Sequence, residues 1–208
     1  MAKRRSGLLA GVVIVLLVAV GAWVFRDHIP GMGRAGSAVA TKVSPEAAEQ
    51  AQAKLERLKQ EGDTVHLTDV EFTSLIRYHL AGLTGPLRDP TVEFVDNKLQ
   101  LSGRVPKDVI PSSPDIDRVR GFLPDTADVT LNGSLRTLRP GHAALDIGAV
   151  TVARVPVPAS YYPVALQKIG RRNEAGLQPN EYPFALPPGV GSARVEGGAL
   201  VLGAAPRP

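Results

Sequence analysis

Few residues in this chain could perform chemistry, and none of them forms a catalytic or metal-binding motif. The sequence contains no cysteine, and the four histidines (His28, His66, His79 and His142) show neither His-x-x-x-His spacing nor the His-Glu-x-x-His motif. No serine lies at the centre of a Gly-x-Ser-x-Gly sequence, so the nucleophile turn of the α/β-hydrolases is absent. These patterns predict a protein that is not an enzyme and that binds no metal or cofactor.

Three other features have a chemical interpretation and a structural one. Gly31–Gly36 matches G-x-G-x-x-G, but a dinucleotide site needs a strand before this motif and a helix after it. The surrounding residues are Gly- and Ala-rich and are typical of a flexible linker. Asp115 and Asp117 lie in a proline-rich stretch, where carboxylates cap turns more often than they transfer protons. His79 continues an apolar helical pattern, which favours a hydrogen-bonded core histidine over a metal ligand.

An apolar run of 18 residues, Leu8–Phe25, follows the basic residues Lys3–Arg5. As a helix this run would be roughly 27 Å long, close to the thickness of a bilayer's hydrocarbon core. The alternative is a cleaved signal peptide, but its apolar core would be shorter. The sequence Val20–Ala22, which resembles a cleavage site, lies inside the run. The pattern therefore favours an uncleaved membrane anchor.

The distribution of charge predicts the topology and excludes nucleic acid. The positive-inside rule places the basic N-terminus in the cytoplasm and residues 27–208 outside the membrane. The 24 basic residues exceed the 20 acidic ones by four, and Lys3, Arg4, Arg5 and Arg26 account for this excess. Residues 27–208 are therefore formally neutral, and no basic surface for nucleic acid is expected on them.

Composition divides the chain into four parts. Residues 1–26 are the basic tip and the anchor, and residues 27–43 are a flexible linker rich in Gly and Ala. Residues 44–203 are long enough for one extracytoplasmic domain with a hydrophobic core, and residues 204–208 are a tail.

Two helices are expected at the start of this domain. Ser44–Glu46 provides an N-cap, a proline for the first turn and an acid, and a thin apolar stripe continues to Gly62. Thr68–Glu71 matches a capping box, and the helix after it is expected to end near Gly82. Its apolar face has helical spacing and consists of Phe72, Leu75, Ile76, His79, Leu80 and Leu83.

Alternating apolar residues predict strands in the remainder of the domain, and Ser160 is predicted to cap a further helix. Short turns between consecutive strands favour antiparallel pairing, so the predicted fold is α+β with one curved antiparallel sheet packed against helices. The predicted strands are Val65–Leu67, Thr91–Val95 with Lys98–Val105, Ala127–Leu138 with Ala143–Val155, and Ser192–Glu196 with Ala199–Leu202.

Beyond these local signals, the layout resembles a known type of protein. An anchor and a spacer are followed by Val65, Leu67, Thr68, Glu71, Phe72, Leu75, Ile76 and Leu80, which form the pattern V-x-L-T-x-x-E-h-x-x-L-h-x-x-x-L, and then by hairpins. Near the C-terminus the similar residues are Pro183, Phe184, Leu186, Pro187 and Gly189. The chain resembles small bacterial membrane-anchored proteins of the YpmS-like type and, more loosely, TULIP-like extracytoplasmic lipid-binding domains. The resemblance implies a role with lipid or in cell-envelope upkeep and assigns no site residue.

The sequence thus leads to two hypotheses of function. The first is a single-pass, membrane-anchored binding protein of the cell envelope that holds lipid or another apolar ligand in a groove. The expected lining of that groove is Phe72, Leu75, Ile76, His79, Leu80 and Phe94. The alternative is a non-catalytic structural or assembly factor whose anchor pairs with a membrane-protein partner.

Overall fold

The computed structural model describes residues 42–79, 87–106, 125–152, 155–168, 171 and 176–206. The predicted anchor at residues 8–25, most of the linker and Gly31–Gly36 lie outside these ranges. No helix among the described residues has the length and apolar character needed to cross a bilayer. The elements in chain order are α2 (Pro45–Glu61), β1 (Val65–Leu67), α3 (Asp69–His79), β2 (Arg88–Val95), β3 (Lys98–Pro106), β4 (Thr126–Arg139), β5 (His142–Val152), β6 (Val155–Val157), the 3-10 turn η3 (Ala159–Tyr161), α5 (Tyr162–Lys168), β7 (Glu181–Ala185), β8 (Val190–Glu196) and β9 (Ala199–Ala204).

Helix α2 begins and ends where its capping residues predict. Ser44 accepts a hydrogen bond on Oγ from the Ala47 N–H at 3.2 Å. At the other end Gly62 adopts φ 81°, and its N–H donates to the Leu58 carbonyl. A left-handed residue at this position favours glycine, which has no Cβ. The predicted stripe is confirmed, because the buried residues of α2 are Ala48, Ala51 and Leu58.

The predicted capping box at the start of α3 is also confirmed. The Glu71 N–H donates to Thr68 Oγ1 at 3.2 Å, and the Thr68 N–H donates to Glu71 Oε2 at 2.9 Å. These reciprocal bonds satisfy N–H groups that the first helical turn leaves without partners. Leu80 and Gly82, where the predicted helix continued, lie outside the described residues.

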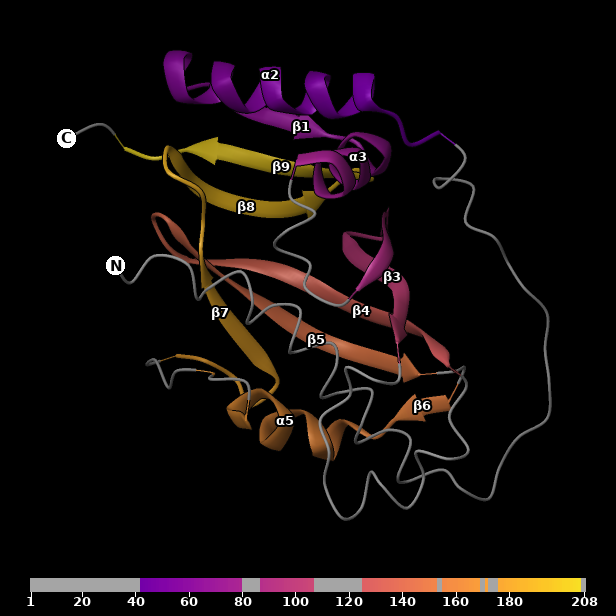
Figure 1. The fold of residues 1–208 in the computed structure, drawn as a ribbon. Helices are drawn as coiled ribbons and strands as arrows, with labels where there is room; N and C mark the ends of the chain where they lie inside the picture. Colours follow the sequence, from indigo (N-terminus) through magenta and orange to yellow (C-terminus); the bar gives the residue numbers. More distant parts are fainter. Residues whose placement is uncertain are drawn as a thin grey trace, which may run out of the picture.

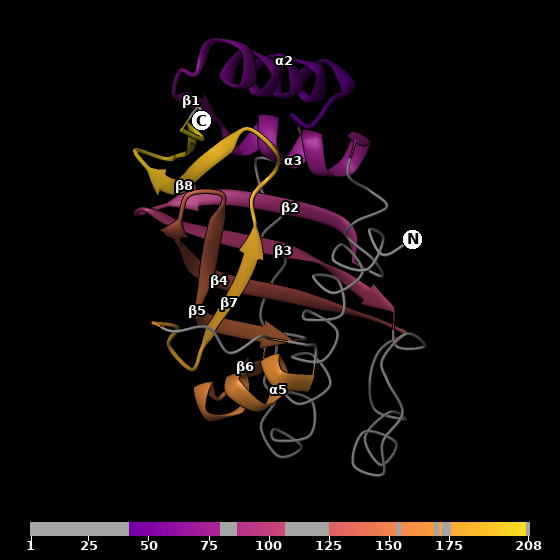
Figure 2. The ribbon, with the colours of Figure 1, turned by 90° about the vertical axis from the view of Figure 1, so that its left-hand side faces the viewer.

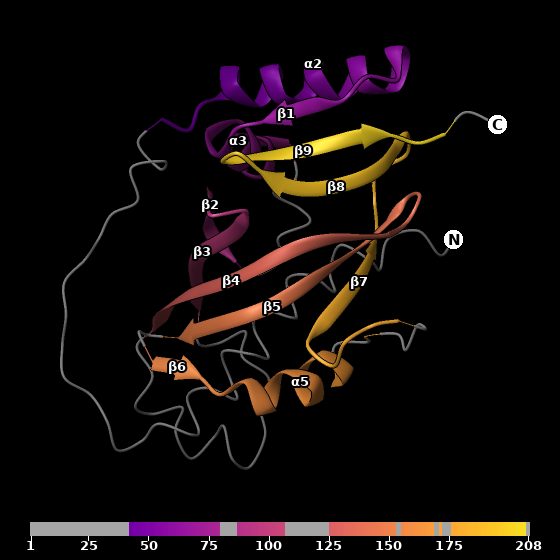
Figure 3. The same cartoon turned by 180° about the vertical axis from the view of Figure 1, so that it is seen from behind.

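The strands form two antiparallel sheets (Figures 1 and 3). The larger sheet has the order β2-β3-β4-β5, with β6 and β7 both paired to β5, and the smaller sheet has the order β1-β9-β8. The three predicted hairpins are confirmed, and the turn residues Asp96 and Asn97 have φ of 49° and 60°, as a type I′ turn requires. The α+β class, with a curved antiparallel sheet and helices, is therefore confirmed. The second sheet and the strands β6 and β7 were not predicted. The predicted further helix is present as α5, but Ser160 lies within η3, the 3-10 turn that precedes it.

The larger sheet has one apolar face because strand β5 contains a bulge. In its sequence Leu145 and Ile147 occupy odd positions, whereas Val150 and Val152 occupy even ones. A regular strand would send these two pairs to opposite faces. The register instead shifts between Asn132 and Gly133 of β4, so that β5 has one extra residue there. The bulge returns both pairs to the same face.

Two hydrophobic clusters cover this face at its two ends. Figure 2 shows α2 outermost, then α3, then β2 of the larger sheet, with α5 at the opposite end. The α5 cluster consists of Leu87, Val105, Ala127, Val129, Leu131, Ile147, Val150, Val152, Val157, Tyr162, Ala165 and Leu166. The α3 cluster consists of Ala51, Leu58, Val65, Leu67, Leu75, Val92, Phe94, Val190, Ala193, Val195, Leu200 and Leu202.

Candidate functional site

Four of the six residues predicted to line an apolar groove lie together, in or against the α3 cluster. Leu75 and Phe94 are 6% and 7% exposed, and Phe72 and Ile76 are partly buried. The Phe72 and Phe94 rings have centroids 5.9 Å apart and are tilted by 38°. These are contacts of packed core side chains.

The other two predicted lining residues lie elsewhere. His79 is the last residue of α3 and is exposed. Leu80 follows it in the sequence and lies outside the described residues.

A second set of apolar side chains is partly exposed where the two clusters meet. Leu101 of β3 packs against both clusters. We call this set the apolar seam, and it consists of Leu99 and Leu101 of β3, Leu135 of β4, Leu145 of β5 and Tyr182 of β7. The sequence placed the first four on predicted strands, but it missed Tyr182 because β7 was not predicted. The alternation of Tyr182 and Phe184 was the available signal for that strand.

Strand register brings the seam residues together. Leu135 lies opposite Leu145, and Leu145 lies opposite Tyr182, so these three form one row across β4, β5 and β7. Gly133, next to this row, lies opposite Leu99 of β3. A Cβ at Gly133 would lie 3.0 Å from Leu145 Cδ1 and 2.5 Å from the Asp146 carbonyl oxygen. Because Gly133 has no Cβ, the side chain of Leu145 can occupy this space.

The two faces of the larger sheet differ in chemical character. The seam contains no ionisable group except the Tyr182 phenol, and the cross-strand row that includes its Leu101 consists of Val92, Leu101, Leu131 and Val150. The opposite face bears polar and charged residues, including Ser102 opposite Thr130, Gln100 opposite Asn132 and Arg104 opposite Asp128. The seam can therefore bind a ligand mainly through apolar contacts, which are stabilised by the hydrophobic effect and by dispersion.

The best-buried carboxylate of the helical layer stabilises the fold. Lys54 Nζ lies 2.7 Å from Glu71 Oε1 and donates to the His66 carbonyl at 2.9 Å. Burial raises the pKa of Glu71, but hydrogen bonds from Lys54 and Thr68 outweigh it, so this pKa lies below its ordinary value. The pair joins α2, β1 and the start of α3.

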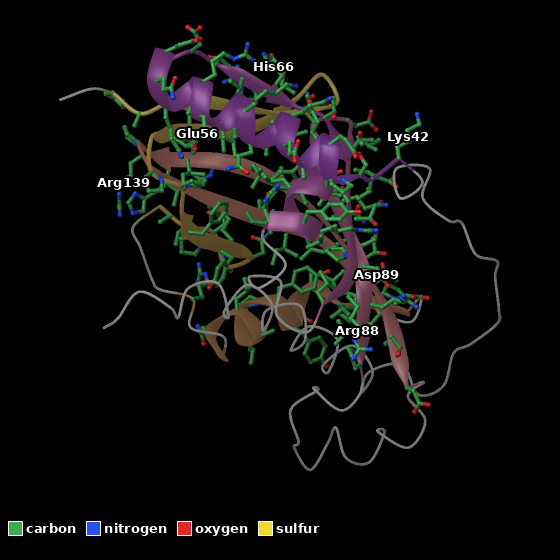
Figure 4. The ribbon with its side chains drawn as sticks, turned by 45° about the horizontal axis from the view of Figure 1, so that its top comes forward. Lys42, Glu56, His66, Arg88, Asp89 and Arg139 are labelled. Carbon is green, nitrogen blue, oxygen red and sulfur yellow. The ribbon has the colours of Figure 1, made fainter. Side chains whose placement is uncertain are left out.

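A depression of about 430 Å³ lies beside this ion pair. Its lining residues are Gln50, Ala53, Lys54, Arg57 and Glu71. Since Lys54 and Glu71 bind each other, Gln50 and Arg57 are the remaining polar groups of the lining. Figure 4 shows Glu56 and His66 near α2 and β1, at the opposite end of the molecule from Arg88 and Asp89 of β2.

A second buried carboxylate fixes β7 on the sheet. Glu181 is 3% exposed and binds Arg136 through two hydrogen bonds, Nε to Oε1 at 2.9 Å and Nη2 to Oε2 at 2.7 Å. The Gln178 N–H donates to Glu181 Oε2, and Arg171 donates to the carbonyls of Gln178 and Glu181. Burial raises the pKa of Glu181, and the bonds from Arg136 and Gln178 lower it by more, so the net change is downward.

At the strand edges, side chains form hydrogen bonds with several backbone N–H and C=O groups. Thr73 Oγ1 of α3 accepts from the Val92 N–H at 2.9 Å and donates to the Val92 carbonyl at 3.1 Å. Thr137 Oγ1 of β4 makes the same two bonds with Ala193 of β8. Arg77 Nε donates to the Pro90 carbonyl at 2.7 Å. These contacts cover edge positions that another chain could otherwise pair with.

Neither a metal centre nor a relative identifies the site. Within the ranges that the structure describes, no group of three or more His, Cys, Asp or Glu residues is placed to hold a metal ion. Comparisons of the chain with protein families, curated proteins and solved structures gave no match in any of the three.

Proposed function

We propose that this chain is a single-pass membrane-anchored protein with an extracytoplasmic domain that binds lipid or another apolar ligand at the apolar seam. The observation that supports the proposal is the partial exposure of Leu99, Leu101, Leu135, Leu145 and Tyr182 on one sheet face between two packed clusters. The apolar run at residues 8–25 supports the anchor.

The hydrophobic effect supplies the driving force for this binding. Each methylene that a ligand buries against leucine side chains contributes about 0.8 kcal/mol. Leu101 contacts both clusters, so a chain lying on it would join two surfaces that are already well packed. The anchor would keep the seam close to a bilayer, which is a source of such chains.

The strand edges favour the sheet face over an edge as the binding surface. A partner that adds a strand needs unpaired N–H and C=O groups along an edge. Thr73 and Arg77 occupy such groups on β2, and Thr137 occupies them on β8. An assembly factor that recruits its partner by strand addition to β2 or β8 is therefore less well supported than a protein that binds on its apolar face.

The proposal includes no catalytic step. A buried carboxylate is a candidate for a general acid or base, and the buried carboxylates among the described residues are Glu71 and Glu181. Each is bound to a cation and to a backbone N–H, and these bonds lower its pKa. A general base at neutral pH needs a raised carboxylate pKa.

Photo-crosslinking in native membranes tests the proposal. Membranes containing the full chain are loaded with a phospholipid that has a photoactivatable acyl chain, and the adducts are mapped by mass spectrometry. We expect adducts on peptides of β3, β4, β5 and β7.

Two tryptophan variants provide the comparison. Leu101→Trp fills the seam and should remove these adducts. Val95→Trp is the matched control, because Val95 is 54% exposed on the other face of the same sheet and should leave the adducts unchanged. Adducts confined to residues 8–25, or equal labelling of both variants, would contradict the proposal.

A further inference from the structure

We propose that Arg77, Arg88 and Arg104 form a binding site for a phosphate group at the start of β2, the edge strand of the larger sheet. We call these three residues the arginine site. Arg104 is three residues from Leu101 along β3, so it lies on the face of the sheet opposite the apolar seam. The site is therefore separate from the surface to which an apolar ligand is assigned above.

A bulge at the start of β2 shapes the backbone of the site. The register with β3 shifts between Arg88 and Thr91, so Asp89 and Pro90 together face one residue of β3. Asp89 adopts φ 49°, in a region that is uncommon for residues other than glycine. In this conformation its carboxylate binds the Arg104 guanidinium. Bulges and backbone conformations of this kind are concentrated at functional sites.

Two of the arginines lie directly opposite each other across β2 and β3. Arg88 and Arg104 are register partners, and both are exposed. Like charges at opposite positions destabilise a strand pair. Arg104 binds Asp89, whereas Arg88 has neither an ion pair nor a side-chain hydrogen bond among the described residues (Figure 4). The pairing thus has no benefit for the fold, but an anion between the two guanidiniums would be bound by both.

Arg77 of α3 supplies a third guanidinium, which neutral acceptors hold in place. Its Nε donates to the Pro90 carbonyl at 2.7 Å, and its Nη2 donates to Thr91 Oγ1 at 2.8 Å and to the Asp89 carbonyl at 3.3 Å. These acceptors have no net charge, so they orient the guanidinium without compensating its positive charge. Nη1 has no hydrogen bond to the described residues, and its two N–H groups can donate to an anion.

The three arginines together favour a negative charge beside β2. The hydrogen bond from Arg104 and the charges of Arg77 and Arg88 hold the pKa of Asp89 below its ordinary value. The same interactions would stabilise an anion that binds from solution next to this carboxylate.

The neighbouring carboxylates offset only part of this positive charge. Asp128 lies opposite Arg104 and interacts with it. Glu93 is five residues from Arg88, about 15 Å along the strand, where salt screens most of its effect. Among the described residues, three cations therefore face two nearby carboxylates, Asp89 and Asp128, and one positive charge remains in excess.

A phosphate group fits these donors better than a second carboxylate does. A guanidinium binds either group through two parallel hydrogen bonds. A carboxylate has only two oxygens, and Asp89 already places one carboxylate at this point. A phosphate is tetrahedral, so its free oxygens can accept from guanidiniums that approach from α3, β2 and β3. A phospholipid head group and a soluble phosphate both present this chemistry.

Equilibrium dialysis of the full chain against labelled inorganic phosphate tests the site in solution. The protein is held in a non-ionic amphipathic polymer, and the ionic strength is kept constant with chloride. We expect saturable binding that Arg88→Gln weakens about fivefold. Arg57→Gln is the matched control, because Arg57 is also exposed and also has no ion pair or side-chain hydrogen bond among the described residues. This control should leave binding unchanged.

A third variant tests whether Asp89 and the bound anion share the same arginines. Asp89→Asn removes the internal carboxylate and keeps a residue that tolerates the left-handed conformation. Phosphate binding should therefore become stronger in this variant. Unchanged or weaker binding would overturn the proposal.

Vesicles distinguish the two sources of the phosphate group. The full chain is reconstituted in phosphatidylcholine vesicles with or without phosphatidylglycerol, and hydrogen exchange of peptides that contain residues 87–91 and 102–105 is measured. Slower exchange with phosphatidylglycerol, lost in Arg88→Gln, would identify a lipid head group as the ligand. Slower exchange only after addition of inorganic phosphate would identify a soluble phosphate.

Two further results would overturn the proposal. The first is no binding of inorganic phosphate together with unchanged exchange in both kinds of vesicle. The second is binding that Arg88→Gln and Arg57→Gln weaken equally, since this would reflect only the overall charge of the protein. Neither result affects the lipid adducts expected at the apolar seam, because that surface lies on the other face of the sheet.

Discussion

We predict that removal of the Thr73 hydroxyl strongly lowers the free energy of unfolding, because this hydroxyl satisfies two buried backbone groups at once. It accepts from the Val92 N–H and donates to the Val92 carbonyl, and Thr73 and Val92 are 0% and 1% exposed. Thr73→Val keeps the shape of the side chain and removes both bonds. Each buried group left without a partner costs about 1–3 kcal/mol, so unfolding should become easier by about 2–6 kcal/mol.

Thr137 provides a matched control for this substitution. Its hydroxyl makes the same pair of bonds with Ala193, but the Thr137 residue is exposed, so water can replace part of what is lost. We expect Thr137→Val to cost less than about 1 kcal/mol. The assay is urea unfolding of the full chain in an amphipathic polymer, followed by circular dichroism. Hydrogen exchange of the peptide containing Val92 should also become faster in the Thr73 variant only. Equal losses in both variants, with unchanged exchange at Val92, would refute the reasoning.

Three further predictions concern acid stability, topology and the start of α3. The pKa of Glu181 is lowered in the folded state, so the contribution of its carboxylate to stability is present at neutral pH and is lost as the pH falls through that lowered value. Glu181→Gln should therefore reduce the fall of the urea midpoint at acid pH. An unchanged fall in this variant would contradict the prediction. The intact protein should stay in carbonate-washed membranes with its C-terminal part open to external protease. A soluble product that begins near Trp23, after Val20–Ala22, or near Thr41, after the similar sequence Ala38–Ala40, would show that the apolar run is a cleaved signal. Thr68→Ala should cost about 0.5–2 kcal/mol and Leu75→Ala about 2–5 kcal/mol in the same unfolding assay, and negligible losses at both positions would show that α3 is not packed on a core.

The features that could be predicted from the sequence are those with local causes. Ser44, Gly62 and the Thr68–Glu71 box act within a few residues of the helix ends that they define. Asp96 and Asn97 determine a hairpin through their own backbone conformation. Such signals need no knowledge of the rest of the chain, and the structure confirms them.

The features that could not be predicted depend on distant residues. Strand β7 contains Pro183, which lies opposite Ala144 of β5, and these two residues are almost forty positions apart in the sequence. Proline lacks an N–H and weakens the local strand pattern, although an edge strand tolerates it. The division into two sheets likewise depends on β1 pairing with β9 from the other end of the domain.

The candidate site illustrates the same limit. Helical spacing correctly placed Phe72, Leu75 and Ile76 on one face of α3, but spacing does not say what that face meets. The face meets the β8–β9 hairpin and Phe94, so these residues became core. The seam was left partly exposed on the larger sheet because the α3 and α5 clusters cover its two ends and meet at Leu101.

The predicted anchor and the seam can serve one purpose if the domain stays near the bilayer. Residues 27–43 separate the anchor from the first described helix, and seventeen residues reach at most about 60 Å when fully extended. If residues 8–25 span a membrane, the start of α2 therefore remains within about two bilayer thicknesses of the membrane surface at any extension. A chain bound weakly at the seam would encounter the same bilayer again after release, because the tether keeps the local concentration of both high.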